Sequence, residues 1–411
     1  MHVLFVHQNY PAQFGHIAHR LVTDLGWKCT FVSRLPARRD GGIRLVQYQL
    51  EGSATADNHP CAQTFENQIW HAHAVYQACE RRLSSAPDLI VGHSGFGSTI
   101  FLRELFDCPI VNYFEYYYHA RNSDIDFRPE FQPSTMDYLR VRARNAMILL
   151  DLDNCDAGYC PTYWQRSLFP AQFQPKLEVI FDGIDTRFWR RRRMKTRKVC
   201  GREVSPKTRI VTYVASGLEA MRGFDIFMQV ARRIYKAYPN VLFVVVGADR
   251  TFYGGDERYI KHATFKEHVL RNNDYDLTRF CFTGQVPANQ LVKLLSLTDL
   301  HIYLSVPFVL SWSVFNALSC ECVVLASDVP PVTEIVQHGT NGLLADFYDI
   351  DELVRQSLDV LRDPGAYRGL GKAGATLIRE KYGLDRCLSN ITGFFQSVRR
   401  DISATAREQM A

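Results

Sequence analysis

The sequence of 411 residues contains no apolar run long enough to cross a membrane. A membrane-spanning helix needs about 18 or more consecutive apolar residues, and no segment reaches that length. The first residues, Met1 and His2, lead directly into an apolar run that begins at Val3, without the profile of a secretory signal peptide. We therefore expect a cytoplasmic protein, and a peripheral position at the inner face of the membrane stays open.

The eleven cysteines lack the spacing of a metal site. Their only close spacings are Cys320-x-Cys322 and Cys155-x4-Cys160, and neither has a second half that would complete a zinc site. An odd number of scattered cysteines is typical of reduced, mostly buried thiols. The sequence therefore predicts neither a structural zinc ion nor a structural disulfide.

Charge of one sign is not in large excess, since the formal net charge is +5. The exception is the basic stretch of residues 187–202, RFWRRRRMKTRKVCGR. It has no aromatic interleaving and no nucleic-acid fold signature, so we expect no nucleic acid partner. A run of like charge is usually solvated, and the alternative is a peripheral contact with an anionic membrane through residues 187–202.

The chain is too long for one ordinary hydrophobic core and suits two domains. Short apolar strands alternate with amphipathic helices from His2 onward, which is the pattern of βαβ units and a parallel sheet. A second series of the same kind begins at Arg209, after the basic stretch. The sequence therefore predicts an α/β fold with Rossmann-like domains at residues 1–189 and 209–383, a basic linker at 190–208, and a helix and tail at 384–411.

Loops that follow predicted strands are the candidate ligand sites of the first half, because open parallel sheets bind ligands at the carboxyl ends of their strands. Residues 8–15 end at Gly15, where no side chain would block a ligand, although a tight turn explains this glycine equally well. The strand of residues 88–91 leads to His93, which could hydrogen-bond a hydroxyl or accept a proton. A histidine bonded to a neighbouring carbonyl is the structural alternative.

Residues 109–118, PIVNYFEYYY, form a predicted strand that ends in an aromatic cluster around Glu115. Aromatic faces pack well against the apolar faces of sugars and lipids, so this cluster is a candidate binding surface. A tyrosine-rich strand end that completes the core is the alternative. The following residues, 121–133, have little periodicity and are predicted as a flexible loop.

The second half contains a strand-helix-strand unit between residues 299 and 328. A loop with Pro307 leads to a helix that begins near Ser311 or Ser313. A helix N-terminus presents free N–H groups and a positive dipole end to an anion, which favours a phosphate-bearing ligand. An ordinary buried unit without a ligand is the alternative.

This unit resembles the nucleotide-sugar loop of GT-B glycosyltransferases, specifically the retaining enzymes of glycosyltransferase family 4. Their pattern is Glu-x-x-Gly-x-x-x-x-Glu-Ala. Here Phe308 stands at the first glutamate, Ser311 at the glycine and Asn316 at the second glutamate. Both glutamates of the motif are therefore replaced, while Ala317 matches.

Other elements carry the resemblance along nearly the whole chain. The family's Gly-Arg-x5-Lys/Arg-Gly loop matches at Arg222-Gly223, whereas Ser216 falls on the first basic position. Phe282-x-Gly284-x-Val286 resembles the element that lies against the nucleotide base in relatives. Residues 334–344 match the family's Glu-Ile-Val segment with its two glycines.

The resemblance implies a GT-B fold, in which two Rossmann-like domains face each other across a cleft and a C-terminal helix returns to the first domain. It implies transfer of a sugar from a nucleoside-diphosphate sugar to an acceptor hydroxyl with retention, without a metal or another cofactor. The partners would be the nucleotide sugar and a small-molecule, glycan or lipid-linked acceptor. Three Asp-x-Asp tripeptides, which begin at Asp124, Asp151 and Asp274, do not sit at predicted strand ends, and we interpret them as solvated acids.

The resemblance also implies site residues. Its catalytic candidates are His93 and Arg222. The donor-binding candidates are Gly15, Ser216, Gly217, Arg222, Gly247, Val286, Phe308, Val309, Leu310, Ser311 and Asn316. The acceptor-binding candidates are Asn9, Tyr10, Glu115 and Tyr117.

Two other functions remain open at this point. A GT-B protein that has lost transfer activity and serves as a binding or partner subunit is favoured by Phe308, Asn316 and Ser216. The retained Arg222 and His93 favour an enzyme, because a protein without activity has no need to keep its cleft. A nucleotide-sugar epimerase with the same double-Rossmann build is the third reading.

Overall fold

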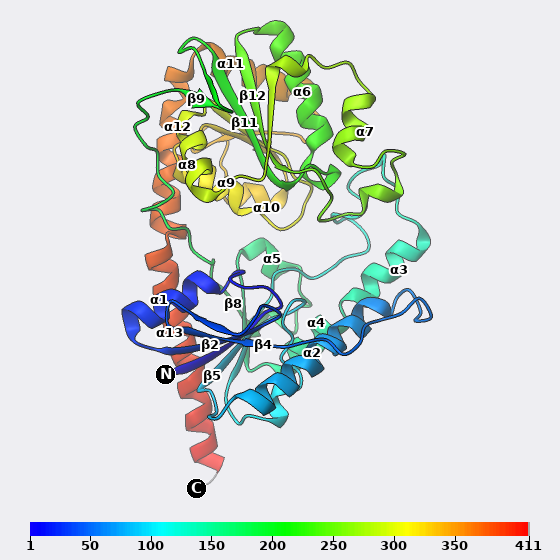
Figure 1. Cartoon of the computed structure of the whole chain (residues 1–411), viewed down its shortest axis with the longest axis vertical. Coiled ribbons are helices and arrows are strands. Elements are labelled where there is room, and N and C mark those ends of the chain that lie inside the picture. Colours follow the sequence, from blue (N-terminus) through cyan, green and yellow to red (C-terminus); the bar gives the residue numbers. More distant parts are fainter. Residues whose placement is uncertain (410–411) are drawn as a thin grey trace. The chain divides into compact units, whose positions relative to one another are not determined.

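The computed structural model describes residues 1–409, and the side chains of residues 1–400. The chain forms two compact units (Figure 1). Unit 1 contains residues 1–121 and 133–183 and the C-terminal stretch from Asp385, and unit 2 contains residues 122–132 and 184–384. The sequence places the first domain at residues 1–189. Unit 1 leaves out residues 122–132 and 184–189 of this range, which belong to unit 2. The last two residues of the expected C-terminal tail lie outside the described residues.

Unit 1 is built on an eight-stranded sheet in the order β3-β4-β2-β1-β5-β6-β7-β8. All neighbours pair in parallel except β3 and β4. The strands are β1 (His2–Val6), β2 (Lys28–Ser33), β3 (Arg38–Asp40), β4 (Ile43–Gln47), β5 (Leu89–His93), β6 (Ile110–Tyr113), β7 (Ala157–Cys160) and β8 (Leu177–Val179). The helical segments are α1 (Gly15–Leu25), α2 (Gln63–Arg82), η1 (Leu102–Glu104), α3 (Thr135–Arg144), α4 (Ala146–Asn154), α5 (Tyr163–Ser167), η2 (Gln174–Lys176) and α13 (Leu384–Gln409).

The central strand β1 divides its side chains between two hydrophobic clusters, because successive residues of a strand point to opposite faces of the sheet. Val3 and Phe5 belong to one cluster, and Leu4 and Val6 belong to the other. All four side chains are fully buried. Parallel sheets are covered on both faces, and the unbroken apolar run of β1 reflects that.

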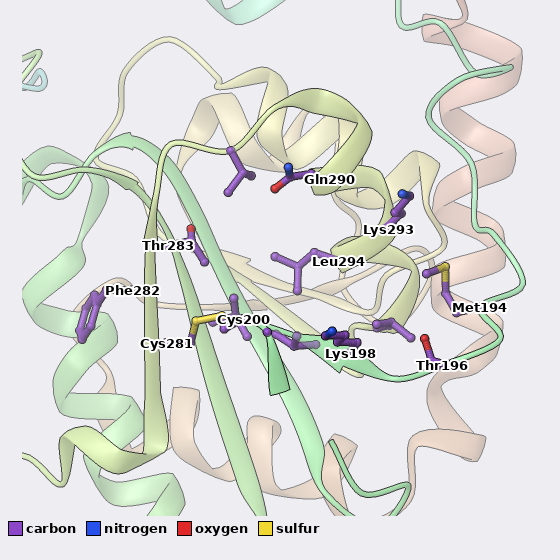
Figure 2. A pocket seen from close by; sticks show the side chains of 15 residues that line it. Met194, Thr196, Lys198, Cys200, Cys281, Phe282, Thr283, Gln290, Lys293 and Leu294 are labelled. Atoms are coloured by element: carbon purple, nitrogen blue, oxygen red, sulfur yellow. A yellow bond between two sulfur atoms is a disulfide. The ribbon is translucent and has the colours of Figure 1, made fainter. Parts of the chain in front are cut away.

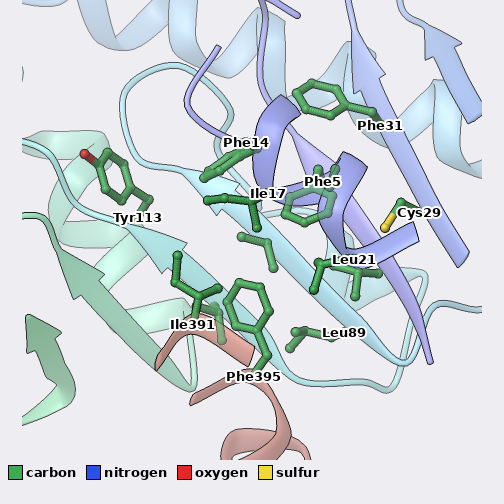
Figure 3. Packing of buried hydrophobic residues seen from close by; sticks show 14 of the residues in the cluster. Phe5, Phe14, Ile17, Leu21, Cys29, Phe31, Leu89, Tyr113, Ile391 and Phe395 are labelled. Carbon is green, nitrogen blue, oxygen red and sulfur yellow. The ribbon is translucent and has the colours of Figure 1, made fainter. Parts of the chain in front are cut away.

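Helix α13 brings the end of the chain back to unit 1. Its Ile391 and Phe395 are fully buried in the cluster that contains Phe5 and Leu89 (Figure 3). The predicted return of a C-terminal helix to the first domain is therefore confirmed.

Unit 2 is built on a six-stranded parallel sheet in the order β13-β12-β11-β14-β15-β16. The strands are β11 (Arg209–Gly217), β12 (Val241–Ala248), β13 (Phe280–Gly284), β14 (Leu300–Tyr303), β15 (Val324–Ser327) and β16 (Leu343–Ala345). The helical segments are η3 (Ala220–Arg222), α6 (Phe224–Ala237), η4 (Asp256–Arg258), α7 (Phe265–Arg271), η5 (Leu277–Arg279), α8 (Ala288–Leu297), α9 (Trp312–Ser319), α10 (Pro330–Thr333), α11 (Ile350–Arg362), α12 (Pro364–Leu377) and a π-helical turn η6 (Ile378–Tyr382).

The basic stretch has defined contacts in unit 2. The backbone N–H of Arg192 donates to Ser296 Oγ (3.0 Å), and the Arg197 guanidinium donates to the Thr208 carbonyl (2.8 Å). The stretch ends in the short antiparallel hairpin of β9 (Lys198–Val199) and β10 (Arg202–Glu203). The linker is therefore docked along unit 2 over this part of its length.

The hairpin is also joined to the sheet by a disulfide between Cys200 and Cys281, with Cα atoms 6.6 Å apart. The prediction that all cysteines are reduced is wrong for this pair. Cys200 lies at the turn of the hairpin and Cys281 lies in strand β13, and 81 residues separate them in sequence. Local spacing cannot show such a pair, because only the fold of the hairpin against the sheet brings the two residues together.

Candidate active site

The turn that follows β11 in unit 2 is shaped by glycine. A Cβ atom on Gly217 would lie 2.3 Å from the Arg250 carbonyl oxygen, and one on Gly247 would lie 2.9 Å from a Leu218 methyl group. Both glycines therefore allow close packing of the backbone at this end of the sheet. Ser216 is exposed at the same strand end.

Two buried acids hold this turn. Glu219 accepts hydrogen bonds from the backbone N–H groups of Phe252 (2.6 Å) and Tyr253 (3.0 Å). Asp256 accepts one from the N–H of Ala220 (2.8 Å). Burial raises the pKa of Glu219 above its usual value, and it raises the pKa of Asp256 to about 7. The motif comparison missed both acids, because their role depends on contacts with the loop after β12.

Arg222 ends the turn and is only 6% exposed. Its guanidinium donates to Ser305 Oγ (3.0 Å) and to the carbonyl of Val309 (3.1 Å). It also lies over the rings of Tyr253 and Phe308, 5.7 and 5.8 Å from their centres. The structure thus brings together the predicted residues Arg222, Phe308 and Val309.

Helix α9 begins directly after this cluster. Ser311 is its N-cap, and Ser311 Oγ accepts a hydrogen bond from the N–H of Ser313 (3.2 Å). Leu310 is buried before the helix, and Asn316 is 8% exposed within it. Asn316 Oδ1 has no hydrogen-bond partner among the described residues. A buried acceptor without a partner is costly, so this oxygen is suited to receive a ligand hydroxyl.

Val286 lies in a different environment. Its side chain packs against the apolar cluster of Val199 and Val244, next to helix α8. Gly15 begins helix α1 of unit 1, where a Cβ atom would lie 2.2 Å from Pro11 Cβ. Close packing against Pro11 therefore explains why a glycine occupies this position.

A strap of residues 122–132 belongs to unit 2 and packs beside the Arg222 turn. Arg128 is 4% exposed, and its guanidinium donates to both carboxylate oxygens of Asp225 (2.9 and 2.6 Å) and to the Ala220 carbonyl (2.7 Å). It also pairs with Glu130. The prediction of a flexible loop at residues 121–133 is therefore wrong, because the buried and hydrogen-bonded Arg128 holds this segment in place.

In unit 1, His93 lies at the carboxyl end of β5 and is fully buried. Its Nδ1 is 2.9 Å from the Ser94 carbonyl oxygen. Since a carbonyl only accepts, Nδ1 carries the proton and Nε2 is an acceptor. Burial lowers the pKa of His93 well below its usual value, so the ring is neutral at pH 7. Nε2 makes no hydrogen bond within the described chain and lies 3.9 Å from Glu115 Oε2.

A cavity of about 280 Å³ opens beside His93. Glu115 lines it, but the other acceptor candidates do not: Asn9 donates its N–H to His7 Nδ1, Tyr10 packs on Phe31, and Tyr117 packs on Phe169. Sequence reasoning missed the part of the lining that comes from helices α2, α3 and α4. The lining residues are Gln8, Thr64, Asn67, Gln68, His71, His93, Ser94, Gly95, Phe96, Glu115, Tyr116, Tyr118, Arg144 and Ile148.

Asp151 holds the turn that follows His93 through hydrogen bonds. It is fully buried and accepts hydrogen bonds from Ser94 Oγ (2.9 Å) and Ser98 Oγ (2.7 Å). Burial raises the pKa of Asp151 to about 6. The interpretation of this residue as a solvated acid is therefore wrong, because helix α4 turns Asp151 inward toward the sheet.

Among the described residues, no helix is both long and apolar enough for a membrane span, and no group of three potential metal ligands occurs.

Two family models match the chain in succession. Residues 25–189 match the glycosyl transferase family 4 group, and residues 200–376 match glycosyl transferases group 1. A curated relative, the N-acetyl-alpha-D-glucosaminyl L-malate synthase of Bacillus anthracis, is 20% identical over 226 residues. That match covers 55% of this chain and 55% of the relative, so the chain spans about half the length of that relative.

Solved structures match over nearly the whole chain. Sucrose-phosphate synthase from Thermosynechococcus elongatus has a TM-score of 0.72 at 16% identity, with 97% of this chain and 98% of that chain covered. HepE from Anabaena, solved in complex with UDP-glucose, has a TM-score of 0.65 at 16% identity, with 97% and 100% covered. An alpha,alpha-trehalose-phosphate synthase (UDP-forming) from Burkholderia vietnamiensis has a TM-score of 0.69 at 13% identity, with 98% and 99% covered. At such identities these matches show the fold.

Proposed function

The chain belongs to the family 4 glycosyltransferases with the GT-B fold, and from this premise we propose that it moves a sugar from a nucleoside-diphosphate sugar to an acceptor hydroxyl with retention. The observation that carries the proposal is the cluster around Arg222 at the N-terminus of α9. A buried cation beside a helix N-terminus is suited to a diphosphate.

In this reaction the bond between the anomeric carbon and the diphosphate oxygen breaks, and the diphosphate keeps the electron pair. The acceptor oxygen forms the new bond, and its proton passes to the leaving diphosphate, which becomes more basic as the bond breaks. Arg222 and the N-terminus of α9 would stabilise the leaving diphosphate more strongly than the bound donor, because its charge grows as the bond breaks. Ser216 would supply only a hydroxyl at the position where relatives have a second basic residue.

The two replaced glutamates define how this donor site differs from the family pattern. Asn316 would accept a hydrogen bond from a nucleotide ribose hydroxyl through its unpartnered Oδ1. Phe308 would form an apolar wall where relatives bind a hydroxyl of the donor sugar. Gly217 and Gly247 would allow the backbone to approach the donor.

The cavity beside His93 would hold the reacting end of the acceptor. Its volume of about 280 Å³ suits a small polar group. The Oε1 atom of Gln68 is buried without a partner among the described side chains, and Nε2 of His93 is a free acceptor there as well. Two acceptors in one cavity favour a ligand that carries hydroxyl groups.

A thermal-shift titration with UDP-, GDP-, TDP- and ADP-sugars tests the donor site. A ligand at ~100 times its Kd stabilises the folded protein by about 2.7 kcal/mol. We expect one nucleotide sugar to raise the melting temperature, with the shift lost in Arg222→Ala and kept in Arg271→Ala, an exposed arginine on α7. The anomeric configuration of the transfer product, measured by NMR, then tests retention.

The alternative is a GT-B protein without transfer activity that acts as a binding or partner subunit. Phe308 in place of a glutamate is the observation that favours it. No thermal shift with any nucleotide sugar would support this alternative and would contradict the proposed donor site.

A further inference from the structure

A second cavity, of about 600 Å³, lies in unit 2 between residues 194–201, strand β13 and helix α8 (Figure 2). This volume is within the range of small-molecule sites. Of the proposed donor residues only Val286 lies on its wall. The cavity is therefore a separate feature from the Arg222 cluster, and we call it the α8 groove.

The base of the α8 groove is apolar, whereas Thr196, Thr283 and Gln290 add polar groups to its walls. Val199 and Val244 are buried at its base, and Leu294 and Leu297 of α8 are only partly covered. A partly covered leucine pair beside a cavity leaves hydrocarbon surface in water, which costs about 25 cal/mol per Å². A hydrocarbon ligand would remove this surface from water.

The rim of the α8 groove is basic. Lys198 on β9 and Lys293 on α8 are its charged lining residues, and no aspartate or glutamate lines it in the described chain. Both lysines are exposed and make no ion pair with another described residue. Lysine stems lie readily along apolar surface while the ammonium group stays in water. The rim therefore suits the anionic head of a ligand whose tail enters the groove.

The basic stretch continues this charge beside the groove. Arg190, Arg191 and Arg193 are exposed, and the bond of Arg192 to Ser296 on α8 holds the stretch against unit 2. Each basic side chain near an anionic membrane adds about 1 kcal/mol of attraction. This electrostatic attraction adds to the free energy gained when a hydrocarbon chain is buried in the groove.

We propose that the α8 groove binds one hydrocarbon chain of an anionic membrane lipid, with the lipid head group between Lys198 and Lys293. The chain would lie against Leu294 and Leu297, and the basic stretch would face the membrane surface. The Cys200–Cys281 disulfide holds the hairpin that carries Lys198 against β13, so it keeps this wall of the groove in place. This site goes beyond glycosyl transfer, and its occupancy is measured without any sugar.

The test uses the full chain and a dansyl-labelled fatty acid as the fluorescent probe. We expect saturable binding at one site per chain. Dioctanoyl-phosphatidylglycerol should displace the probe, glycerol 3-phosphate should not, and dioctanoyl-phosphatidylcholine should displace it more weakly. Flotation with phosphatidylglycerol vesicles should recover the protein, whereas phosphatidylcholine vesicles should not.

Two variants probe the two parts of the groove. Lys198→Gln with Lys293→Gln removes the basic rim, and we expect the Kd for phosphatidylglycerol to rise about fivefold for each lysine. Leu294→Gln places a polar group on the wall and should weaken binding of the dansyl-labelled fatty acid itself. The control is Lys207→Gln with Lys236→Gln, which removes the same charge from exposed positions elsewhere in unit 2.

Several results would overturn the proposal. They are absence of probe binding by the wild-type chain, displacement by glycerol 3-phosphate as efficient as by the lipid, or equal loss of affinity in the rim variant and its control. Probe binding without flotation on anionic vesicles would also overturn it, because the site would then serve a free fatty acid. If Leu294→Gln does not fold, the exposed rim variant still decides the outcome.

Discussion

At the residue scale, two buried carboxyl groups hold the Arg222 turn. Glu219 and Asp256 accept backbone hydrogen bonds from both sides of the turn. Burial disfavours the charged form of each acid, and only neighbouring N–H groups and cations offset that cost. As the pH rises and these buried acids ionise, the folded protein therefore loses stability relative to the unfolded chain.

Asp256→Asn should make the protein more stable at pH 8. The pKa of Asp256 is about 7 in the folded chain, above the ordinary value of 3.8, so its favourable contribution is complete below pH 3.8 and is lost as the pH rises through 7. Asparagine still accepts the Ala220 N–H but does not ionise. We expect its gain over wild type to grow by roughly 2 kcal/mol between pH 5 and pH 8.

Urea unfolding of both proteins at pH 5, 6.5 and 8 measures this gain. Asp276→Asn is the contrasting control, because hydrogen bonds from Thr278 lower the pKa of this exposed acid. It should show no gain at pH 8. A constant difference between wild type and Asp256→Asn at all three pH values would contradict the prediction.

The Phe308 wall leads to a prediction about donor choice. An apolar wall cannot accept a hydrogen bond from a sugar hydroxyl, so it favours a donor sugar that lacks that hydroxyl. We expect a higher kcat/KM with a deoxy sugar donor than with the parent hexose, and we expect Phe308→Gln to reverse the preference by about tenfold or more. Turnover with the ordinary hexose donor and none with any deoxy sugar would contradict this.

At the scale of elements, the strap of residues 122–132 shows how a segment without periodicity becomes ordered. Phe127 packs against Phe347 and Tyr348, and Phe131 packs against Phe265. The aromatic contacts flank Arg128, whose charge is balanced by Asp225 and Glu130. The strap thus supplies a guanidinium donor to the Ala220 carbonyl of the donor-loop turn.

Arg128→Ala should cost about 3 to 5 kcal/mol of stability, because it leaves the Asp225 carboxylate partly buried without its cation. Arg128→Lys should recover only part of this, since an ammonium group cannot form the two parallel bonds of a guanidinium. Arg140→Ala, an exposed arginine on α3, is the control and should cost less than about 0.5 kcal/mol. Calorimetric unfolding measures all three.

Donor affinity tests whether the strap has a role beyond stabilising the fold. If the Ala220 contact positions the Arg222 turn, Arg128→Lys should weaken donor binding at a temperature where the protein is fully folded. Isothermal titration with the donor found by thermal shift measures this. Unchanged donor affinity in Arg128→Lys would limit the strap to stability.

At the scale of the whole molecule, unit 1 contains both ends of the described chain. Helix α13 adds Leu388, Ile391, Phe395 and Val398 to a cluster whose other buried members come from the first 180 residues. The ion pairs of Arg399 with Asp88 and of Arg20 with Asp385 join α13 to unit 1 at its surface. Unit 1 is therefore completed only when the last helix has folded onto it.

Phe395→Ala should destabilise unit 1 by about 3 to 5 kcal/mol, the usual cost of a buried phenylalanine. The adjacent Phe394 is only partly buried, so Phe394→Ala is a matched control on the same helix with a smaller expected loss. Differential scanning calorimetry measures both. Equal losses in the two variants would contradict the packing of Phe395 in the cluster.

The sequence by itself determined those elements that have a clear local pattern. Helical spacing of Ile17 and Leu21 before Gly26 predicts α1 and its end, and the structure has Gly26 as a left-handed C-cap (φ 64°). The apolar run of β1 and the strand that leads to His93 follow from equally local patterns, whereas the turn at Arg222-Gly223 follows from the resemblance to the family motif. These features are readable because helix and strand periodicity and glycine conformation act over a few neighbouring residues.

Only the tertiary structure decided which residues meet. Arg128 and Asp225, Asp151 and Ser94, and Cys200 and Cys281 are each more than 50 residues apart in sequence. An isolated sequence segment carries no signal of such pairs, because the same arginine, aspartate or cysteine is equally suited to a solvated position. Their roles arise when burial removes water and the fold supplies the partner that replaces it.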